Sequence, residues 1–206
     1  MANSQPWSNS SMELLKRILF TLQMLYRYRH ALAEISQSTP HHRQLRQISP
    51  STLKQQGVSV LVLDFDGVLA AHGETIPAKE LQHWLLDAVK TFGSTQIFVL
   101  SNKPLPSRQA YFNHYFPGVQ CISDVKKKPY PDGLQRIVAL TGQPAEALML
   151  ADDRLLTGCL AACIANVPVT YITHPYVLMS KRPIQELFFM MLRFLERRLI
   201  WLLNWR

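Results

Sequence analysis

The sequence predicts an α/β fold in which a parallel sheet is covered by helices on both faces. Short apolar runs rich in β-branched residues alternate with segments of helical periodicity between residues 58 and 172. Strands that are apolar along their whole length are typical of a parallel sheet buried on both sides. The chain has 206 residues, of which 48% are hydrophobic and 17% charged, so it is long and apolar enough for one domain with a core.

The elements follow from the hydrophobic pattern along the chain. Val58–Leu63 is a short apolar run with β-branched residues, which predicts a buried first strand. Ala78–Phe92 has helical periodicity, and Gln96–Leu100 predicts a second buried strand. The later part predicts, in order, a helix, a short strand, a helix, a strand, a helix and a strand: Pro106–Phe116, Val119–Ile122, Asp132–Leu140, Ala147–Leu150, Gly158–Ala165 and Val169–Ile172.

The net charge of +8 is concentrated at the two ends of the chain. Met1–Gln56 carries +5 and Lys181–Arg206 carries +4, whereas Gly57–Ser180 carries −1. Basic termini of this kind favour contact with an anionic partner, such as a membrane surface or a nucleic acid. We therefore expect three parts: a basic amphipathic helix with a linker over residues 1–44, an α/β domain over 45–180, and a second basic amphipathic helix over 181–206.

Both ends predict helices that lie on a membrane surface. Near the N-terminus, apolar residues recur at helical spacing among basic ones: Leu14, Ile18, Leu22 and Leu25. In the C-terminal segment, apolar residues surround four polar positions that fall on one helical stripe: Glu186, Arg193, Arg197 and Asn204. Charged residues interrupt it well short of the roughly 20 apolar residues that cross a bilayer. We expect an interfacial helix with its apolar face in the membrane and its arginines at the headgroups; packing against the domain is the alternative.

Polar groups stand where the predicted strands end. Asp64-Phe65-Asp66-Gly67 follows the first strand, Ser101-Asn102-Lys103 the second, and Asp152-Asp153 the fourth, with Lys128-Pro129 between the last two. This ordered set of acid pair, hydroxyl, lysine and acid pair resembles the haloacid dehalogenase superfamily of phosphohydrolases. The resemblance implies a Rossmann-like sheet and a phosphatase domain over residues 45–180, with its chemistry at the carboxyl ends of the strands.

The chemistry of phosphoryl transfer suits the first acid pair. The reaction needs an in-line nucleophile and neutralisation of the phosphoryl oxygens. Asp64 is the expected nucleophile, because a carboxylate can attack phosphorus and form an aspartyl-phosphate. Asp66 is expected on the same side of an extended backbone, where it would protonate the leaving oxygen and later deprotonate water.

The same chemistry predicts a cation and phosphate-binding groups. Carboxylates crowded around a phosphate dianion would repel it, so we expect Mg²⁺ as a cofactor. Its expected ligands are Asp64, the backbone carbonyl of Asp66, and the pair Asp152-Asp153. Three residues are expected to hold the phosphoryl oxygens: Ser101, Asn102 and Lys128.

Further stretches look like the YqeG-type phosphatases: Ile48-Ser49-Pro50, Lys128-Pro129, Asp153-Arg154-Leu155-Leu156-Thr157, and the Glu-Arg-Arg core within Arg193–Leu199. That family is similar to the phosphatidylglycerophosphate phosphatases of mitochondria and plastids, which implies a membrane lipid phosphate as the substrate. The family pattern has an acid where this chain has Gly158. Asp152 is the candidate replacement for the acid missing at position 158. If Asp152 does not fill that role, the resemblance implies reduced activity.

The spacing of the motifs leaves no room for an inserted cap domain. Only 34 positions separate Asp66 from Leu100, and 24 separate Lys103 from Lys127. A capless site would admit a headgroup still fixed in a bilayer, and the run Lys126-Lys127-Lys128 adds positive potential for an anionic lipid. We therefore expect a phosphatase that is peripheral on the cytoplasmic face of a membrane.

Two other functions stay open. One is a phosphatase of a soluble nucleotide or sugar phosphate, which would leave the basic termini without a role. The other is a catalytically impaired binding module on RNA or ribosomes. Aromatic residues flank basic ones near both ends: Tyr26, Tyr28, Trp201 and Trp205. They suit a membrane interface, although base stacking uses the same residue types, and a nucleic acid is the less favoured partner.

Overall fold

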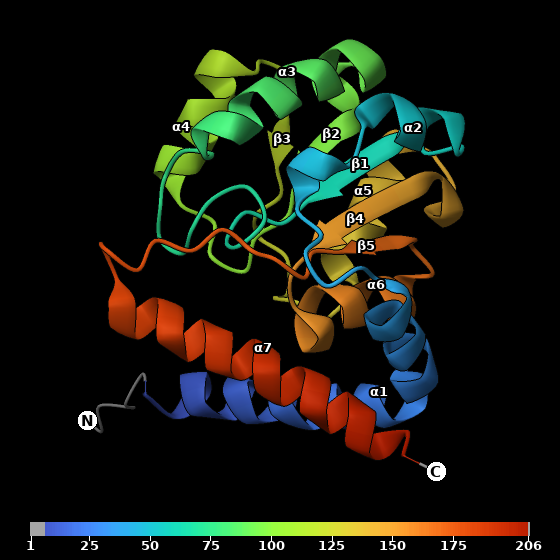
Figure 1. Cartoon of the computed structure of the whole chain (residues 1–206), viewed down its shortest axis with the longest axis vertical. Coiled ribbons are helices and arrows are strands. Elements are labelled where there is room, and N and C mark those ends of the chain that lie inside the picture. The colour runs from blue at the N-terminus through green and yellow to red at the C-terminus, as the bar shows by residue number, and fades with distance from the viewer. Residues whose placement is uncertain (1–6, 206) are drawn as a thin grey trace, which may run out of the picture.

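The computed structural model describes residues 7–205, which form a five-stranded parallel sheet with helices around it (Figure 1). The strands are β1 (Val60–Leu63), β2 (Ile97–Val99), β3 (Gln120–Cys121), β4 (Leu148–Asp152) and β5 (Val169–Tyr171), in the order β3-β2-β1-β4-β5. The helices are α1 (Trp7–Ser38), α2 (Pro50–Gln55), α3 (Lys79–Phe92), α4 (Pro106–Tyr115), α5 (Asp132–Thr141), α6 (Leu160–Ala165) and α7 (Pro183–Leu203). The predicted terminal segments also include residues 1–6 and Arg206, which lie outside the described residues.

The predicted α/β architecture is confirmed, because every pairing in the sheet is parallel. The five expected strands and the helices between them occur where the hydrophobic pattern places them. Two details differ. The short helix α2 was not expected, and it begins at Pro50, whose fixed φ suits a first helical position. The helix expected over Gly158–Ala165 begins earlier, with a π-helical turn over Leu155–Cys159 that leads into α6.

The side chains of β1 alternate between two apolar cores. Leu61 and Leu63 pack toward α2, α3 and α4, whereas Val60 and Val62 pack toward α5 and α6. All four residues are fully buried, as expected for the central strand of a sheet that is covered on both faces. Polar side chains are therefore accommodated at the ends of the strands.

The central strands end at the same level. Leu63 of β1 is in register with Val99 of β2 and Ala151 of β4. The ladder continues for one residue, since the Asp64 N–H donates to the Ala151 carbonyl at 2.9 Å. The chain leaves β1 toward β2 on one side, while β4 lies on the other side, so β1 and β4 flank the point where the strand order reverses. Such a point is where open α/β sheets bind ligands.

Helices α1 and α7 lie side by side along one side of the domain (Figure 1). Leu25, Leu32 and Ile200 are buried in a third apolar cluster with the turn before α6, and the Asn204 side chain donates to the Arg29 carbonyl at 3.1 Å. Both helices leave many large apolar side chains exposed: Leu14, Leu15, Ile18, Leu19 and Leu22 on α1, and Ile184, Leu187, Phe188, Met191, Phe194, Leu195, Trp201 and Leu202 on α7. No helix in residues 7–205 is long and apolar enough to cross a membrane.

The polar stripe of α7 faces the domain, which corrects part of the sequence interpretation. Arg193 was expected at the lipid headgroups, but its exposed fraction is 3%, and Glu186 on the same stripe is 0% exposed. Arg197 on the same stripe is exposed. The reason is electrostatic, because Glu186 and Arg193 have partners of opposite charge or hydrogen-bonding groups in the interior of the domain. Helix α7 thus packs through its polar side and leaves its apolar side outward.

Candidate active site

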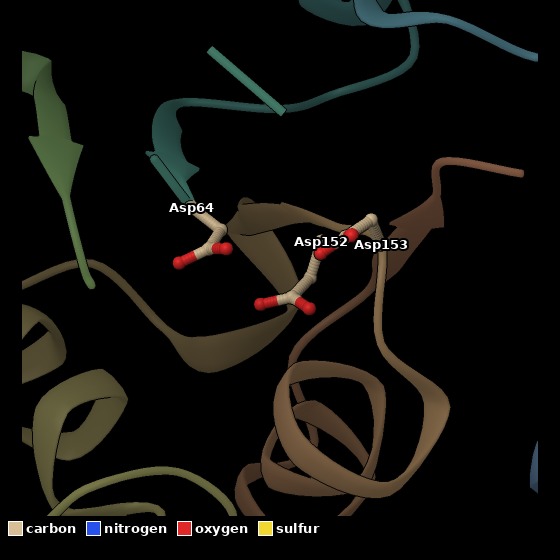
Figure 2. Close-up of side chains that lie close together, drawn as sticks. All are labelled: Asp64, Asp152 and Asp153. Carbon is tan, nitrogen blue, oxygen red and sulfur yellow. The ribbon is translucent and has the colours of Figure 1, made fainter. Parts of the chain in front are cut away.

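Three carboxylates converge at the carboxyl ends of β1 and β4 (Figure 2). Asp64 directly follows β1, Asp152 is the last residue of β4, and Asp153 comes next. Each offers one oxygen, and these three oxygens lie within 4.8 Å of one another. The residues are buried, with exposed fractions of 7%, 0% and 1%, respectively. The sequence predicted that these residues would meet, and the parallel register of β1 and β4 brings them together.

Lys128 neutralises part of this cluster. Its ammonium group donates to Asp64 Oδ1 at 2.8 Å and to Asp152 Oδ2 at 2.6 Å. Burial alone would disfavour the charged lysine, but the neighbouring Asp152 and Asp64 charges outweigh it and raise the pKa of Lys128. Asn102 holds this segment in place: its Oδ1 accepts from the Lys128 N–H at 2.7 Å and its Nδ2 donates to the Lys128 carbonyl at 3.2 Å. Asn102 therefore positions Lys128, and its expected role in binding phosphate stays a prediction.

Burial raises the pKa values of two of these carboxyl groups, Asp64 and Asp153. It raises the pKa of Asp64 to about 8, because Lys128 only partly offsets the desolvation and the charges of Asp152 and Asp153 add to it. Burial likewise raises the pKa of Asp153 to about 6, although Arg193 acts in the opposite direction. A divalent cation among these oxygens would favour the charged forms and lower both pKa values.

Asp153 has one oxygen bound to the protein and one free. Its Oδ2 accepts from Arg193 Nε at 2.6 Å and also pairs with the Arg193 Nη2. Its Oδ1 is buried and has no hydrogen-bond partner among the described residues. A buried, unpartnered carboxylate oxygen beside two further carboxylates is a donor set that fits a hard cation such as Mg²⁺.

Asp66 is not part of the group of three carboxylates and is instead paired with Arg108. Arg108 donates to its two oxygens at 2.6 and 2.8 Å, and the Gly73 N–H donates to Oδ1 at 3.0 Å. Burial raises the pKa of Asp66, but the hydrogen bonds and charge of Arg108 outweigh that effect and lower it. The carboxylate form is thus favoured at neutral pH. The expected role of the Asp66 backbone carbonyl as a metal ligand stays a prediction.

A cavity of about 160 Å³ joins the predicted catalytic and phosphate-binding residues. It is lined by Asp64, Asp66, Ser101, Asn102, Lys128 and Asp153 together with side chains of α7. The Ser101 hydroxyl donates to Asp66 Oδ2 at 3.4 Å and accepts from the Lys103 N–H at 3.1 Å. Asp152 does not line this cavity, because its carboxylate is turned to Lys128 and to the Arg154 N–H, at 2.9 Å.

Gly158 adjoins Asp152 directly. A β-carbon at position 158 would overlap the Asp152 carboxylate. The Asp152 side chain therefore fills the space into which a side chain at 158 would project. This geometry supports the interpretation that the acid at 152 stands in for the one the resemblance expects at 158.

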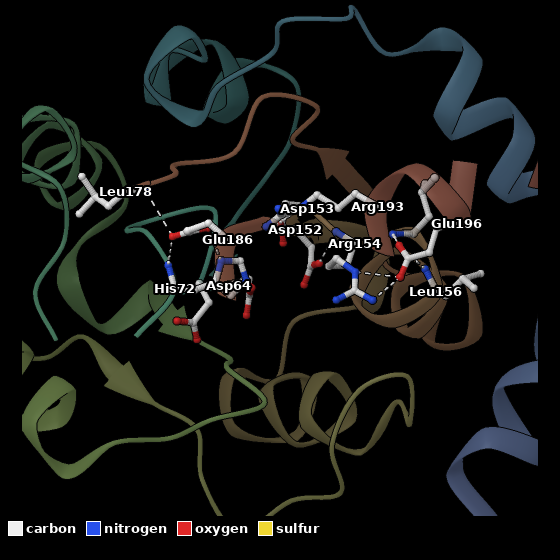
Figure 3. Close-up of polar contacts among 12 residues, drawn as sticks. Asp64, His72, Asp152, Asp153, Arg154, Leu156, Leu178, Glu186, Arg193 and Glu196 are labelled. Carbon is white, nitrogen blue, oxygen red and sulfur yellow. Dashed lines mark hydrogen bonds and ion pairs between the residues drawn. The ribbon is translucent and has the colours of Figure 1, made fainter. Parts of the chain in front are cut away.

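Helix α7 contributes three buried charges that sequence reasoning did not place at the site (Figure 3). Besides Arg193, Glu186 accepts from the N–H and the ring of His72 at 3.2 and 3.3 Å. Glu196 accepts from Arg154 Nε at 2.8 Å and from the Leu155 N–H at 3.0 Å. The sequence signals were the polar stripe, which does not tell which surface it faces, and the Glu-Arg-Arg core that contains Glu196.

No known family model, curated protein or solved structure that was compared with the chain matches it. The function proposed below therefore rests on the residues of the chain, their arrangement in the fold and the order of its motifs. The buried carboxylates at the ends of β1 and β4 carry most of that weight.

Replacing Gly158 with Ala should destabilise the protein. The new methyl group would overlap the Asp152 carboxylate, and overpacking of this kind costs about 1–3 kcal/mol. In an Asp152→Ala background the same change should cost nothing, because the overlap is gone and Ala favours a helix. Urea denaturation of the four proteins measures this coupling. An equal loss in the free energy of unfolding in the wild-type and Asp152→Ala backgrounds would show that Gly158 and Asp152 do not share this space.

Replacing Arg193 with Met should cost about 3 kcal/mol at pH 8, because Asp153 would be left as an unpaired buried charge. The pKa of Asp153 is already raised to about 6, and it would rise further without Arg193. At pH 5 Asp153 is then protonated, so the loss should be smaller. Denaturation at both pH values tests this, with the exposed Arg197→Met as the control. If the loss in the free energy of unfolding is the same at both pH values, the substitution has removed only packing and not a charge pair.

Proposed function

We propose that the chain is an Mg²⁺-dependent phosphomonoester hydrolase that works through an aspartyl-phosphate. The observation that carries the proposal is the buried set of three carboxylates with an unpartnered Asp153 oxygen beside Lys128. Asp64, Asp152 and Asp153 would hold the ion. When bound, Mg²⁺ neutralises the negative charge that a phosphate brings to these carboxylates.

The residues of the cavity divide the reaction between them. A bond forms from a carboxylate oxygen of Asp64 to phosphorus as the ester P–O bond breaks, and the leaving oxygen takes a proton from Asp66. Water then attacks the phosphoryl group, Asp66 takes its proton, and the bond to Asp64 breaks. The ion pair with Arg108 favours the carboxylate form of Asp66, which the second step needs in order to accept the proton of water. For the first step, the charge of the bound phosphate would raise the pKa of Asp66.

The architecture supports the haloacid dehalogenase-like assignment, and the YqeG-type assignment as its finer form. The four motifs stand at the carboxyl edge of one parallel sheet, in the order that the resemblance requires. The segments from β1 to β2 and from β2 to β3 contain, apart from turns, one helix each, α3 and α4. Neither is an inserted cap domain, and Gln185 and Phe189 of α7 border the cavity instead.

The outward faces of α1 and α7 favour a substrate in a membrane. Contiguous exposed apolar surface marks a binding surface for a protein or a membrane. Arg17, Lys126 and Lys127 line a pocket together with Leu14 of this surface, where they would attract anionic lipid. Lys128 does not contribute there, because it is buried against the carboxylates. We therefore propose a peripheral enzyme on the cytoplasmic face of a membrane, acting on a lipid phosphate such as phosphatidylglycerophosphate.

Asp64→Asn should abolish phosphate release while leaving the fold intact, because an amide cannot form the acyl-phosphate. Asp66→Asn should lower the rate by about 10²–10⁴-fold, the usual contribution of a general acid and base. Phosphate release with Mg²⁺ is measured side by side on a lipid phosphate in vesicles and on soluble nucleotide and sugar phosphates. Wild-type turnover in Asp64→Asn would exclude the mechanism. Preference for a soluble ester would overturn the lipid assignment.

The protein should sediment with anionic vesicles, and salt should weaken this binding because each basic residue near the surface contributes roughly 1 kcal/mol that ions screen. Replacing Trp201 and Trp205 with Ala should remove most of the binding without loss of thermal stability, since both are exposed. Tyr115→Ala is the matched control, an exposed aromatic residue on α4. A folded wild-type protein that fails to sediment would contradict the membrane assignment. So would an equal loss of vesicle binding in the tryptophan variant and in the Tyr115→Ala control.

A further inference from the structure

A groove of about 600 Å³ runs between α1 and α7 and the loops at the sheet edge. Its volume lies within the range of ligand pockets, about 300–1,000 Å³. Most of its lining is apolar, with the main contributions from both helices and the turn before α6: Ile18, Leu22, Leu156, Leu192, Leu195 and Leu199. The groove is distinct from the cavity that holds the catalytic residues.

The groove borders the catalytic cavity. Four residues line both of them: Asn102, Lys128, Arg154 and Thr157. Lys128 therefore stands between the carboxylates on one side and the apolar groove on the other. A molecule that fills both spaces would have a phosphate at one end and an apolar chain at the other.

The charged groups of the groove agree with an amphiphile of negative charge. Arg17 of α1 and Arg198 of α7 line it, and Arg154 lies where it meets the cavity. In the groove lining these arginines outnumber the single carboxylate, Glu196, which is already paired with Arg154. An acidic lipid could place its phosphate in the cavity, its backbone near the arginines and its chain against the leucines.

We propose that this groove is the subsite for an acyl chain of the phosphorylated lipid that the site acts on. The inference deepens the proposed function and rests on it for the identity of the phosphate. One chain leaves the bilayer and enters the groove, while the outward faces of α1 and α7 stay on the membrane. Chain length, and not the headgroup alone, then determines how tightly the substrate binds.

The test uses monoalkyl phosphonates, which carry a phosphate-like group and are not hydrolysed. Wild-type protein with Mg²⁺ is titrated calorimetrically with the methyl, butyl, octyl and dodecyl compounds, below micelle-forming concentrations and without vesicles. Affinity should rise about fourfold for each methylene that the groove buries. Equal affinity across the series would overturn the proposal.

Variants locate the binding. Leu199→Trp should fill the groove and weaken dodecyl phosphonate at least about tenfold while leaving methyl phosphonate unchanged, and Ile18→Trp should do the same from α1. Leu187→Trp, exposed on α7 outside the groove, is the matched control. Equal losses in Leu187→Trp and Leu199→Trp would place the chain elsewhere and overturn the proposal. The outcome is independent of turnover, because a protein that binds long chains in the groove but releases no phosphate contradicts the proposed function alone.

Discussion

The structure depends on the burial of three carboxylates at the end of a parallel sheet. Like charges this close are unfavourable away from water, and each requires a partner. Lys128 supplies one positive charge between Asp64 and Asp152, and Arg193 supplies a second against Asp153. The remaining imbalance appears as raised pKa values and an unpartnered oxygen. A bound divalent cation would remove it.

This requirement also explains how the C-terminal helix is oriented. Arg193 has to reach Asp153, and Glu186 and Glu196 meet His72 and Arg154 on the same side. Three charged side chains of α7 are consequently buried in the protein, and many of its apolar side chains are left outside. The helix that completes the charge balance of the site is therefore also part of the surface proposed to contact the membrane and of the groove proposed to hold a chain.

Much of the fold could be predicted from the sequence because each signal was local. The apolar run Val58–Leu63 and the periodicity of Ala78–Phe92 needed no distant partner to be interpreted. The convergence of Asp64 with Asp152-Asp153 followed from the rule that parallel strands end at one edge.

The rest could not be predicted because it depends on contacts between distant parts of the chain. Arg108 pairs with Asp66 and Arg193 with Asp153, each across about 40 residues, and no motif gave either arginine these partners. An amphipathic pattern gives the two faces of α7 but not which one meets the domain. That choice was made by buried charges whose positions only the folded chain defines.

Trapping the covalent intermediate tests directly whether Asp64 is the nucleophile. The enzyme is quenched during turnover of a lipid phosphate with Mg²⁺ and treated with borohydride, which reduces an aspartyl-phosphate to homoserine, and its peptides are then sequenced by mass spectrometry. Homoserine is expected at position 64 when substrate is present, and it should be absent from a control without substrate. Homoserine at another aspartate, or none while phosphate is being released, would contradict the assignment of Asp64 as the nucleophile.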